Sequence, residues 1–193
     1  MSILDEIVAA KRAEIAGRHR REPVEELRRL AEARGRPPRL SAALRRRDIG
    51  LIAEVKRRSP SAGVIRDPFD PAAIAAAYAG AGADGVSVLV DGPYFGGGDE
   101  AVRAAREAID RPILYKEFVV DPWQIAHAAS LGASAVLLLA GVLERDEVVG
   151  FTDSARSFGL ECLLEVHDDD EMALAREVGA EFVGINNRDL KTF

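Results

Sequence analysis

Cysteine, histidine and long apolar runs are scarce in this sequence of 193 residues. The single cysteine, Cys162, excludes a disulfide within the chain, and we expect it to be a buried, unreactive thiol. The three histidines, His19, His127 and His167, lie far apart without metal-ligand spacing, so we expect no metal site. No signal peptide precedes Ser2 and no apolar run approaches membrane-spanning length, which favours a cytoplasmic protein without a membrane partner.

The balance of charge also limits the possible partners. The formal net charge is −6, so a nucleic-acid-binding role has no overall electrostatic support. Arginines are frequent between residues 18 and 47, but glutamates alternate with them, which is typical of solvated helix faces. Apolar residues make up 48% of the sequence, which is enough for the large core of one domain.

Three short segments of the chain resemble one another. They read GADGVSVLV, GASAVLLLA and GAEFVGINN, and they begin at Gly82, Gly132 and Gly179. Each follows an alanine-rich amphipathic stretch and leads into an aliphatic run. This pattern predicts a helix that ends at a glycine and is followed by a short buried strand.

Other aliphatic runs lie between these segments and complete a regular alternation of strands and helices. The predicted strands cover about 51–55, 85–90, 113–117, 134–139, 160–166 and 181–186. Strands that alternate with helices indicate βαβ units and a parallel sheet, so the fold class is α/β. The spacing fits a (βα) barrel as readily as a doubly wound sheet.

About fifty residues precede the first predicted strand. Residues 2–18 and 24–34 have helical patterns, and residues 34–47 predict a loop with a short third helix. This segment is too short to form a sizeable core of its own, so it should pack on the main body. We therefore predict an N-terminal helical extension over 1–48 and a partial barrel over 49–193.

Polar side chains occur at the ends of four predicted strands. Glu54 and Lys56 end the first strand, Lys116 the third, Glu165 the fifth and Asn186 the sixth. Parallel strands align their C-terminal ends at one rim, which is where barrels and open α/β sheets place their active sites. Lysines and carboxylates that converge in a half-buried mouth can carry out acid–base chemistry.

These strand ends belong to longer motifs that resemble one enzyme family. The motifs cover residues 52–65 (IAEVKRRSPSAGVI), 86–98 (VSVLV…YFGGG), 113–125 (ILYKEFVVDPWQI), 163–171 (LLEVHDDDE) and 184–193 (GINNRDLKTF). Together they resemble indole-3-glycerol-phosphate synthase. The resemblance implies a (βα)8 TIM barrel and no metal or organic cofactor. It also implies a small phosphorylated substrate, 1-(2-carboxyphenylamino)-1-deoxyribulose 5-phosphate, which loses CO₂ and water as the indole ring closes during tryptophan biosynthesis.

The resemblance also implies catalytic roles for the charged strand ends. Lys116 would be the general acid that protonates the ketone oxygen during ring closure. Glu165 would take part in the later proton transfers and the dehydration. Lys56 would hold anionic groups of the substrate and assist water loss, and Glu54 would position Lys56 and contact the sugar hydroxyls.

Further residues are implied in substrate binding. Asn186 and Arg188 would orient the substrate, and Ser59 would lie near it on the first loop. The candidates for the pocket that holds the aromatic ring are Pro60, Phe95, Phe118 and Leu137.

Two positions depart from the family pattern as it is usually found. Tyr115 stands where an arginine usually precedes the catalytic lysine, and Val90 stands where a threonine usually ends the second strand. We expect the loss of the arginine to remove one charge that acts on Lys116. We expect both changes to affect the substrate detail and the rate more than the fold.

The length of the chain leaves alternatives open. A complete barrel takes about 250 residues, and this chain stops after the sixth predicted strand, before the two strands whose loops would bind the phosphate. We expect a fragment of a longer protein. If the end is natural, the unpaired sheet edges predict self-association or completion of the barrel by a partner. The alternatives are a non-catalytic chain or another phosphate-binding barrel such as phosphoribosylanthranilate isomerase, which lacks the E-x-K-x-x-SPS pattern.

Overall fold

A computed structural model describes residues 2–187, and its main sheet has six parallel strands. The strands lie side by side in chain order: β1 (Ile52–Val55), β4 (Gly85–Leu89), β5 (Ile113–Lys116), β6 (Ala135–Leu139), β7 (Glu161–Val166) and β8 (Val183–Ile185). All six predicted strands are therefore confirmed. The sequential order, with a helix between each pair of neighbours, is that of an incomplete TIM barrel.

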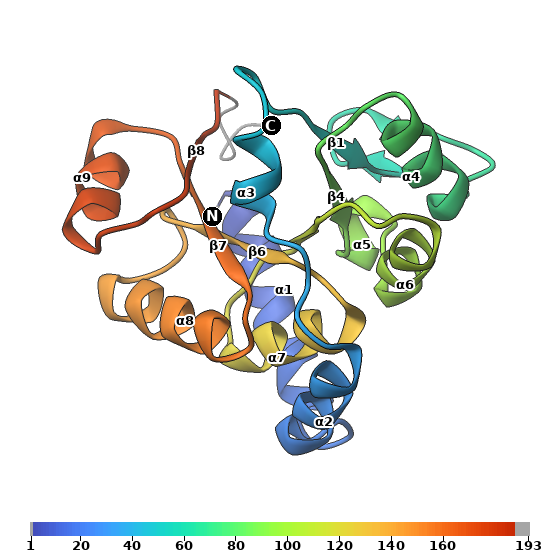
Figure 1. The fold of residues 1–193 in the computed structure, drawn as a ribbon. Helices are drawn as coiled ribbons and strands as arrows, with labels where there is room; N and C mark the ends of the chain where they lie inside the picture. Colours follow the sequence, from blue (N-terminus) through green and yellow to red (C-terminus); the bar gives the residue numbers. More distant parts are fainter. Residues whose placement is uncertain (1, 188–193) are drawn as a thin grey trace.

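Helices cover the outside of this curved sheet, as Figure 1 shows. They are α4 (Pro71–Gly80), α6 (Asp99–Ala108), α7 (Pro122–Leu131), α8 (Arg145–Ser157) and α9 (Asp169–Glu177), whereas the short α5 (Gly92–Phe95) lies in the loop after β4. The segment between β1 and α4 also forms a hairpin, β2 (Arg58–Ser59) and β3 (Gly63–Val64), which the sequence did not predict. Across residues 2–187, every helix is too short or too polar to cross a bilayer.

Three helices precede the first strand: α1 (Ile3–Arg18), α2 (Val24–Arg34) and α3 (Leu40–Leu44). Helix α1 begins at a capping box, in which Ser2 and Asp5 each bond the backbone amide of the other. Leu4 and Ile7 of α1 and Leu40 of α3 pack into the concave side of the sheet. Helix α2 packs on α7. Helices α1 and α3 thus help to fill the concave side of the sheet, whereas α2 lies outside it.

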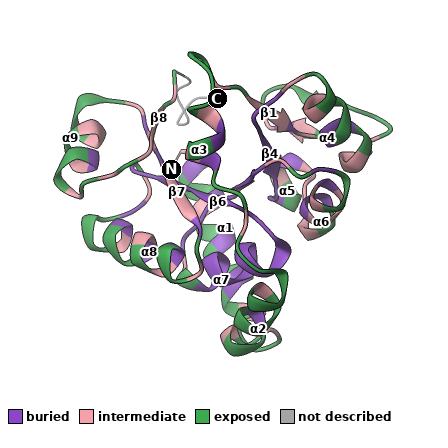
Figure 2. Cartoon of the chain, in the orientation of Figure 1, coloured by how far each residue is buried: buried purple, intermediate pink, exposed green. Residues whose placement is uncertain are grey.

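The core has two layers because side chains alternate between the faces of each strand. On β5, Ile113 and Tyr115 point outward into a large cluster between the sheet and its helices. Leu114 points inward, where it joins Leu89 and Leu137 in the cluster that fills the concave side. Figure 2 shows the buried residues concentrated along the strands and on the inner sides of the helices. The same alternation directs Lys116 inward.

The loop after β4 shows how the mouth of the barrel is shaped. Asp91 caps α5 by accepting hydrogen bonds from the amides of Tyr94 (2.7 Å) and Phe95 (3.2 Å). The chain then turns back so closely that a Cβ atom on Gly97 would overlap the carbonyl oxygen of Leu89. Only glycine fits this approach, which holds Phe95 at the inner rim.

Candidate active site

One cavity of about 300 Å³ lies at the C-terminal ends of the strands and collects most of the predicted site residues. Eight of them line it: Glu54, Lys56, Phe95, Lys116, Phe118, Leu137, Glu165 and Asn186. Leu89, Glu117 and Leu139 complete the lining. The rim is therefore charged, whereas the floor is aliphatic and aromatic.

Glu54 joins the two lysines of the cavity. Its Oε2 lies 3.0 Å from the Nζ of Lys116, and its Oε1 accepts a hydrogen bond from Lys56. Burial alone would raise the pKa of Glu54, but the charge of Lys116 and the hydrogen bonds of both lysines outweigh burial, so the pKa is lowered. Glu54 is therefore an anion between two ammonium groups, and it ties β1 to β5 across the intervening β4.

A second polar pair lies further along the sheet. The Oε1 of Glu165 accepts a hydrogen bond of 2.8 Å from the Nδ2 of Asn186, which follows β8. Glu165 is paired in register with Leu139 of β6, and Lys116 is paired with Leu89 of β4. Lys116 and Glu165 lie on strands separated by β6, so their backbones are roughly 10 Å apart. A small molecule on the apolar floor can reach both groups.

A buried ion cluster lies directly behind Lys116. The Nζ of Lys11, on α1, lies 2.9 Å from Glu117, 3.2 Å from Asp91 and 2.9 Å from Glu14. Burial would lower the pKa of Lys11, but its three carboxylate neighbours raise it. The carboxylates share this single cation, so burial prevails at Glu117 and raises its pKa to about 7 against the effect of Lys11. The cluster fixes α1 to the ends of β4 and β5.

Comparison with known proteins connects this arrangement to one family. The sequence matches the family of indole-3-glycerol phosphate synthase over residues 4–193. The chain belongs to this family. It is 47% identical to the indole-3-glycerol phosphate synthase of Geobacillus thermodenitrificans, covering 99% of this chain and 72% of the relative. It is 41% identical to that of Roseiflexus sp., covering 100% of this chain and 74% of the relative.

Solved structures support the fold assignment at low sequence identity. A crystal structure of 3-hexulose-6-phosphate synthase superposes with a TM-score of 0.53 at 16% identity, covering 72% of this chain and 66% of that one. The carboxyl transferase domain of Rhizobium etli pyruvate carboxylase superposes with a TM-score of 0.51 at 16% identity, covering 70% of this chain and 27% of that one. At such identities the likeness concerns the barrel fold alone.

Three residues that the synthase resemblance implies are not in the cavity lining. Two of them, Ser59 and Pro60, lie elsewhere in the structure, and the third lies outside the described residues. Ser59 is buried in strand β2, where its hydroxyl accepts a hydrogen bond of 3.2 Å from the amide of Ala62. Pro60 follows it in the turn of the hairpin. Arg188 lies outside the described residues. The first two shape the loop above β1 in this structure and do not contact the cavity floor.

Tyr115 and Val90, the two residues that depart from the synthase pattern, lie on a face of the sheet that we had not predicted for them. Tyr115 and Val90 both lie in the outer core cluster, on the face of the sheet opposite the cavity. The Tyr115 hydroxyl lies 3.4 Å from the Nδ1 of His127 on α7. Alternation along β5 places residue 115 behind the sheet, so the charge whose loss we expect would act on Lys116 from the opposite face.

The buried charge of Lys11 was not predicted from the sequence, although its position in the helical pattern indicated it. Lys11 occupies the buried stripe of α1 between Ile7 and Ile15, each four residues away. A lysine on an apolar stripe at helical spacing indicates a buried charge that needs a partner. Its partners could not be inferred, since Asp91 and Glu117 lie far along the chain.

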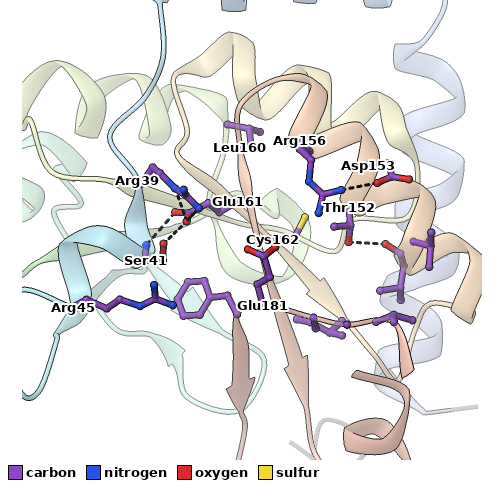
Figure 3. A pocket seen from close by; sticks show the side chains of 17 residues that line it. Arg39, Ser41, Arg45, Thr152, Asp153, Arg156, Leu160, Glu161, Cys162 and Glu181 are labelled. Atoms are coloured by element: carbon purple, nitrogen blue, oxygen red, sulfur yellow. Dashed lines mark hydrogen bonds and ion pairs between the residues drawn. The ribbon is translucent and has the colours of Figure 1, made fainter. Parts of the chain in front are cut away.

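A different cavity, of about 240 Å³, lies at the N-terminal end of β7 and is shown in Figure 3. There Glu161 accepts hydrogen bonds from the Ser41 amide (3.0 Å) and from the Arg39 Nε (3.1 Å). Arg156 pairs with Asp153 at 2.8 Å. The contacts of Glu161 with Arg39 and Ser41 hold α3 against the lower rim, where contacts at the N-terminal face of a barrel serve stability.

Cys162 lines this lower cavity and has no place in the synthase site. It lies on the outer face of β7, half-buried against the core. Burial raises the pKa of its thiol to about 11. The thiol is therefore protonated at neutral pH, in agreement with the unreactive role expected from the sequence.

Proposed function

We propose that the chain carries the synthase reaction of its family: ring closure, decarboxylation and dehydration of 1-(2-carboxyphenylamino)-1-deoxyribulose 5-phosphate. The observation that carries the proposal is the chain of contacts from Lys56 through Glu54 to Lys116, opposite the pair of Glu165 and Asn186, in one cavity. This arrangement offers proton donors and acceptors on two sides of an apolar floor.

In this proposal Lys116 starts the reaction. Its ammonium donates a proton to the ketone oxygen of the substrate as the aromatic carbon attacks the ketone carbon, so that negative charge does not build up on the oxygen. Glu54 holds the ammonium at 3.0 Å and keeps it on the inner face of the sheet. Lys56 binds the carboxylate that leaves as CO₂ and then assists departure of the hydroxyl as water.

Glu165 acts in the later steps of the proposed reaction. Loss of CO₂ restores the benzene ring, and dehydration then completes the indole, which requires that a proton leave one carbon of the new five-membered ring while the hydroxyl leaves the neighbouring carbon. The carboxylate of Glu165 takes this proton, and Asn186 fixes the orientation of the carboxylate through the hydrogen bond of 2.8 Å. Phe95 and Phe118, with ring centroids 6.1 Å apart, flank the aromatic part of the substrate.

The phosphate of the substrate needs a separate site. In barrels of this type that site is commonly built by the loops after strands seven and eight. The six strands described here include neither. We therefore propose that efficient turnover requires two further βα units, supplied in the same chain or by a partner.

The test is a fluorescence assay of indole-3-glycerol phosphate formation. The 193-residue chain is assayed alone and after extension with the last two βα units of the Geobacillus thermodenitrificans relative. We expect activity in the extended protein and little or none in the shorter one. An extended protein that folds, by circular dichroism and cooperative unfolding, but has no activity would overturn the proposal.

Two variants of neighbouring residues make the assay specific for the cavity. Lys116→Met removes the proposed acid and should reduce turnover by roughly 10²–10⁴-fold. Tyr115→Phe changes the adjacent residue, whose side chain lies on the opposite face of β5, and should leave turnover within about threefold of the parent. Equal losses in both variants would indicate a general structural effect.

A further inference from the structure

His167 is held next to the active-site cavity by a glutamate of the following helix. It comes directly after β7, and both its backbone amide and its ring contact the Oε2 of Glu171 on α9, at 2.8 Å from the amide and 3.2 Å from Nδ1. The backbone of Glu171 is itself fixed, because its amide donates to the Asp168 carboxylate at 2.9 Å. The imidazole therefore has a set orientation.

The space for this glutamate is kept open by a glycine. A Cβ atom on Gly141, which follows β6, would lie 2.5 Å from the Oε1 of Glu171. Any other residue there would displace the carboxylate from the ring of His167. The loop after β6 and helix α9 are thus both fitted to the contact between Glu171 and His167.

The other ring nitrogen of His167 faces the proposed base. Its Nε2 is buried and has no hydrogen-bond partner among residues 2–187, and it lies 3.9 Å from the Oε1 of Glu165. Glu165 lies on β7 and His167 follows the end of that strand directly, and the approach of Nε2 to Oε1 places the ring beside the carboxylate that lines the cavity. A shift of about 1 Å would bring the two atoms within hydrogen-bond distance.

The contact with Glu171 determines which ring nitrogen of His167 carries the hydrogen. A carboxylate accepts, so Nδ1 carries the hydrogen and Nε2 of the neutral ring presents a lone pair. That lone pair faces an oxygen of Glu165. The two groups form a hydrogen bond only when one proton lies between them, either on the carboxyl group or on Nε2.

We propose that His167, oriented by Glu171, is a positioning residue that exchanges a proton with Glu165 during turnover. This inference rests on the proposed function. After Glu165 takes a proton from the substrate, its O–H bond breaks, an N–H bond forms at Nε2, and the carboxylate is regenerated. The imidazolium then returns the proton from Nε2 to water that enters the cavity after product release, since Nε2 is itself buried although 20% of the side chain is exposed.

The first experiment compares variants in the protein extended to a complete barrel. His167→Gln keeps a hydrogen-bonding side chain of similar reach but cannot exchange a proton. We expect kcat to fall roughly 10–100-fold, with KM within about twofold. Glu171→Gln keeps an acceptor for the backbone amide and should lower kcat about tenfold. A His167→Gln enzyme with kcat within threefold of the parent would overturn the inference.

Glu165→Gln separates this inference from the proposed function. If Glu165→Gln is nearly inactive and His167→Gln is normal, the role of His167 is wrong while the synthase proposal survives. If Glu165→Gln retains parent activity, the proposed role of Glu165 fails and the inference fails with it. Matched unfolding midpoints of all three variants show that the losses are not caused by unfolding.

Ring-nitrogen NMR of His167 tests the geometry without turnover. The charged groups that face the ring are Glu165 on the preceding strand β7 and Glu171 on α9, whereas Asp168 faces the amide of Glu171. We expect the neutral ring to carry its proton on Nδ1, and its titration midpoint to move in Glu165→Gln. A ring protonated on Nε2, or a midpoint unchanged in this variant, would contradict the proposed proton exchange.

Discussion

The ammonium of Lys116 lies 3.0 Å from Oε2 of Glu54, and this ion pair spans the mouth of the barrel from β5 to β1. Because Glu54 also binds Lys56, one carboxylate sets the position of both cavity cations. Neither lysine therefore has an independent position, and the acid–base properties of both lysines depend on the carboxylate of Glu54.

Neutralising this anion is the first test. Glu54→Gln should lower kcat by roughly 10²-fold or more in the complete barrel, because two ammonium groups then face each other without the charge that separates them. Steady-state kinetics would measure the loss. Glu14→Gln offers a control, since it neutralises a more exposed carboxylate on the Lys11 cluster. Similar losses in both variants would argue against a specific role for Glu54.

Glu117 makes stability depend on pH in a direction unusual for a carboxylate. Its pKa is raised by burial to about 7, so the folded protein binds this proton more tightly than the unfolded chain. Its contribution is complete at pH values below the unfolded pKa and is lost as the pH rises through about 7. Measured by urea unfolding, the free energy of unfolding should decrease between pH 5 and 8, and Glu117 should account for at most about 3 kcal/mol of this decrease.

The comparison with Glu117→Gln isolates that decline. The amide does not titrate, so the variant should lose this part of the pH dependence while the contributions of other groups persist. Parallel stability curves for the parent and the variant across this pH range would show that Glu117 does not hold a proton near neutrality.

Lys11 is the single cation among three carboxylates, two of them buried. Lys11→Met should destabilise the protein by about 3–5 kcal/mol, because Asp91 and Glu117 then remain buried without a positive charge. The adjacent Arg12 is a suitable control, since it is half exposed and 3.7 Å from its partner Glu147. Arg12→Met should cost less than about 1 kcal/mol. Equal unfolding free energies for the two variants would refute the distinction.

Gly97 tests the link between loop geometry and the substrate pocket. A methyl group there would overlap the carbonyl oxygen of Leu89, so Gly97→Ala must displace the loop that carries Phe95. We expect KM to rise several-fold and stability to fall by about 1–3 kcal/mol. Gly98→Ala is the matched control, because no atom lies within 4 Å of the corresponding position. An unchanged KM in Gly97→Ala would separate the loop from substrate binding.

Much of the cavity could be predicted from sequence because two simple rules operate. Side chains alternate along a strand, and parallel strands end at a common rim, so Glu54, Lys116 and Glu165 had to converge once the strands were identified. The same alternation was not applied to Tyr115, whose side chain is adjacent to Lys116 in sequence but lies behind the sheet.

The remaining features depend on contacts between distant parts of the chain. Lys11 and Glu117 are 106 positions apart, and no local pattern states that they pair. Gly141 and Glu171 belong to different loops and helices, so the space that Gly141 leaves for the Glu171 carboxylate beside His167 could not be inferred either. Local patterns predict elements and faces, whereas such pairings require the packed structure.

The separation of Lys11 from its partners has a consequence for the order of folding during synthesis. Helix α1 leaves the ribosome before β5, and its buried ammonium can pair with Glu117 only 106 residues later. Ser41 of α3 bonds Glu161, which follows it by 120 residues. Until these partners have been made, the nascent chain must hold the apolar faces of both helices unburied.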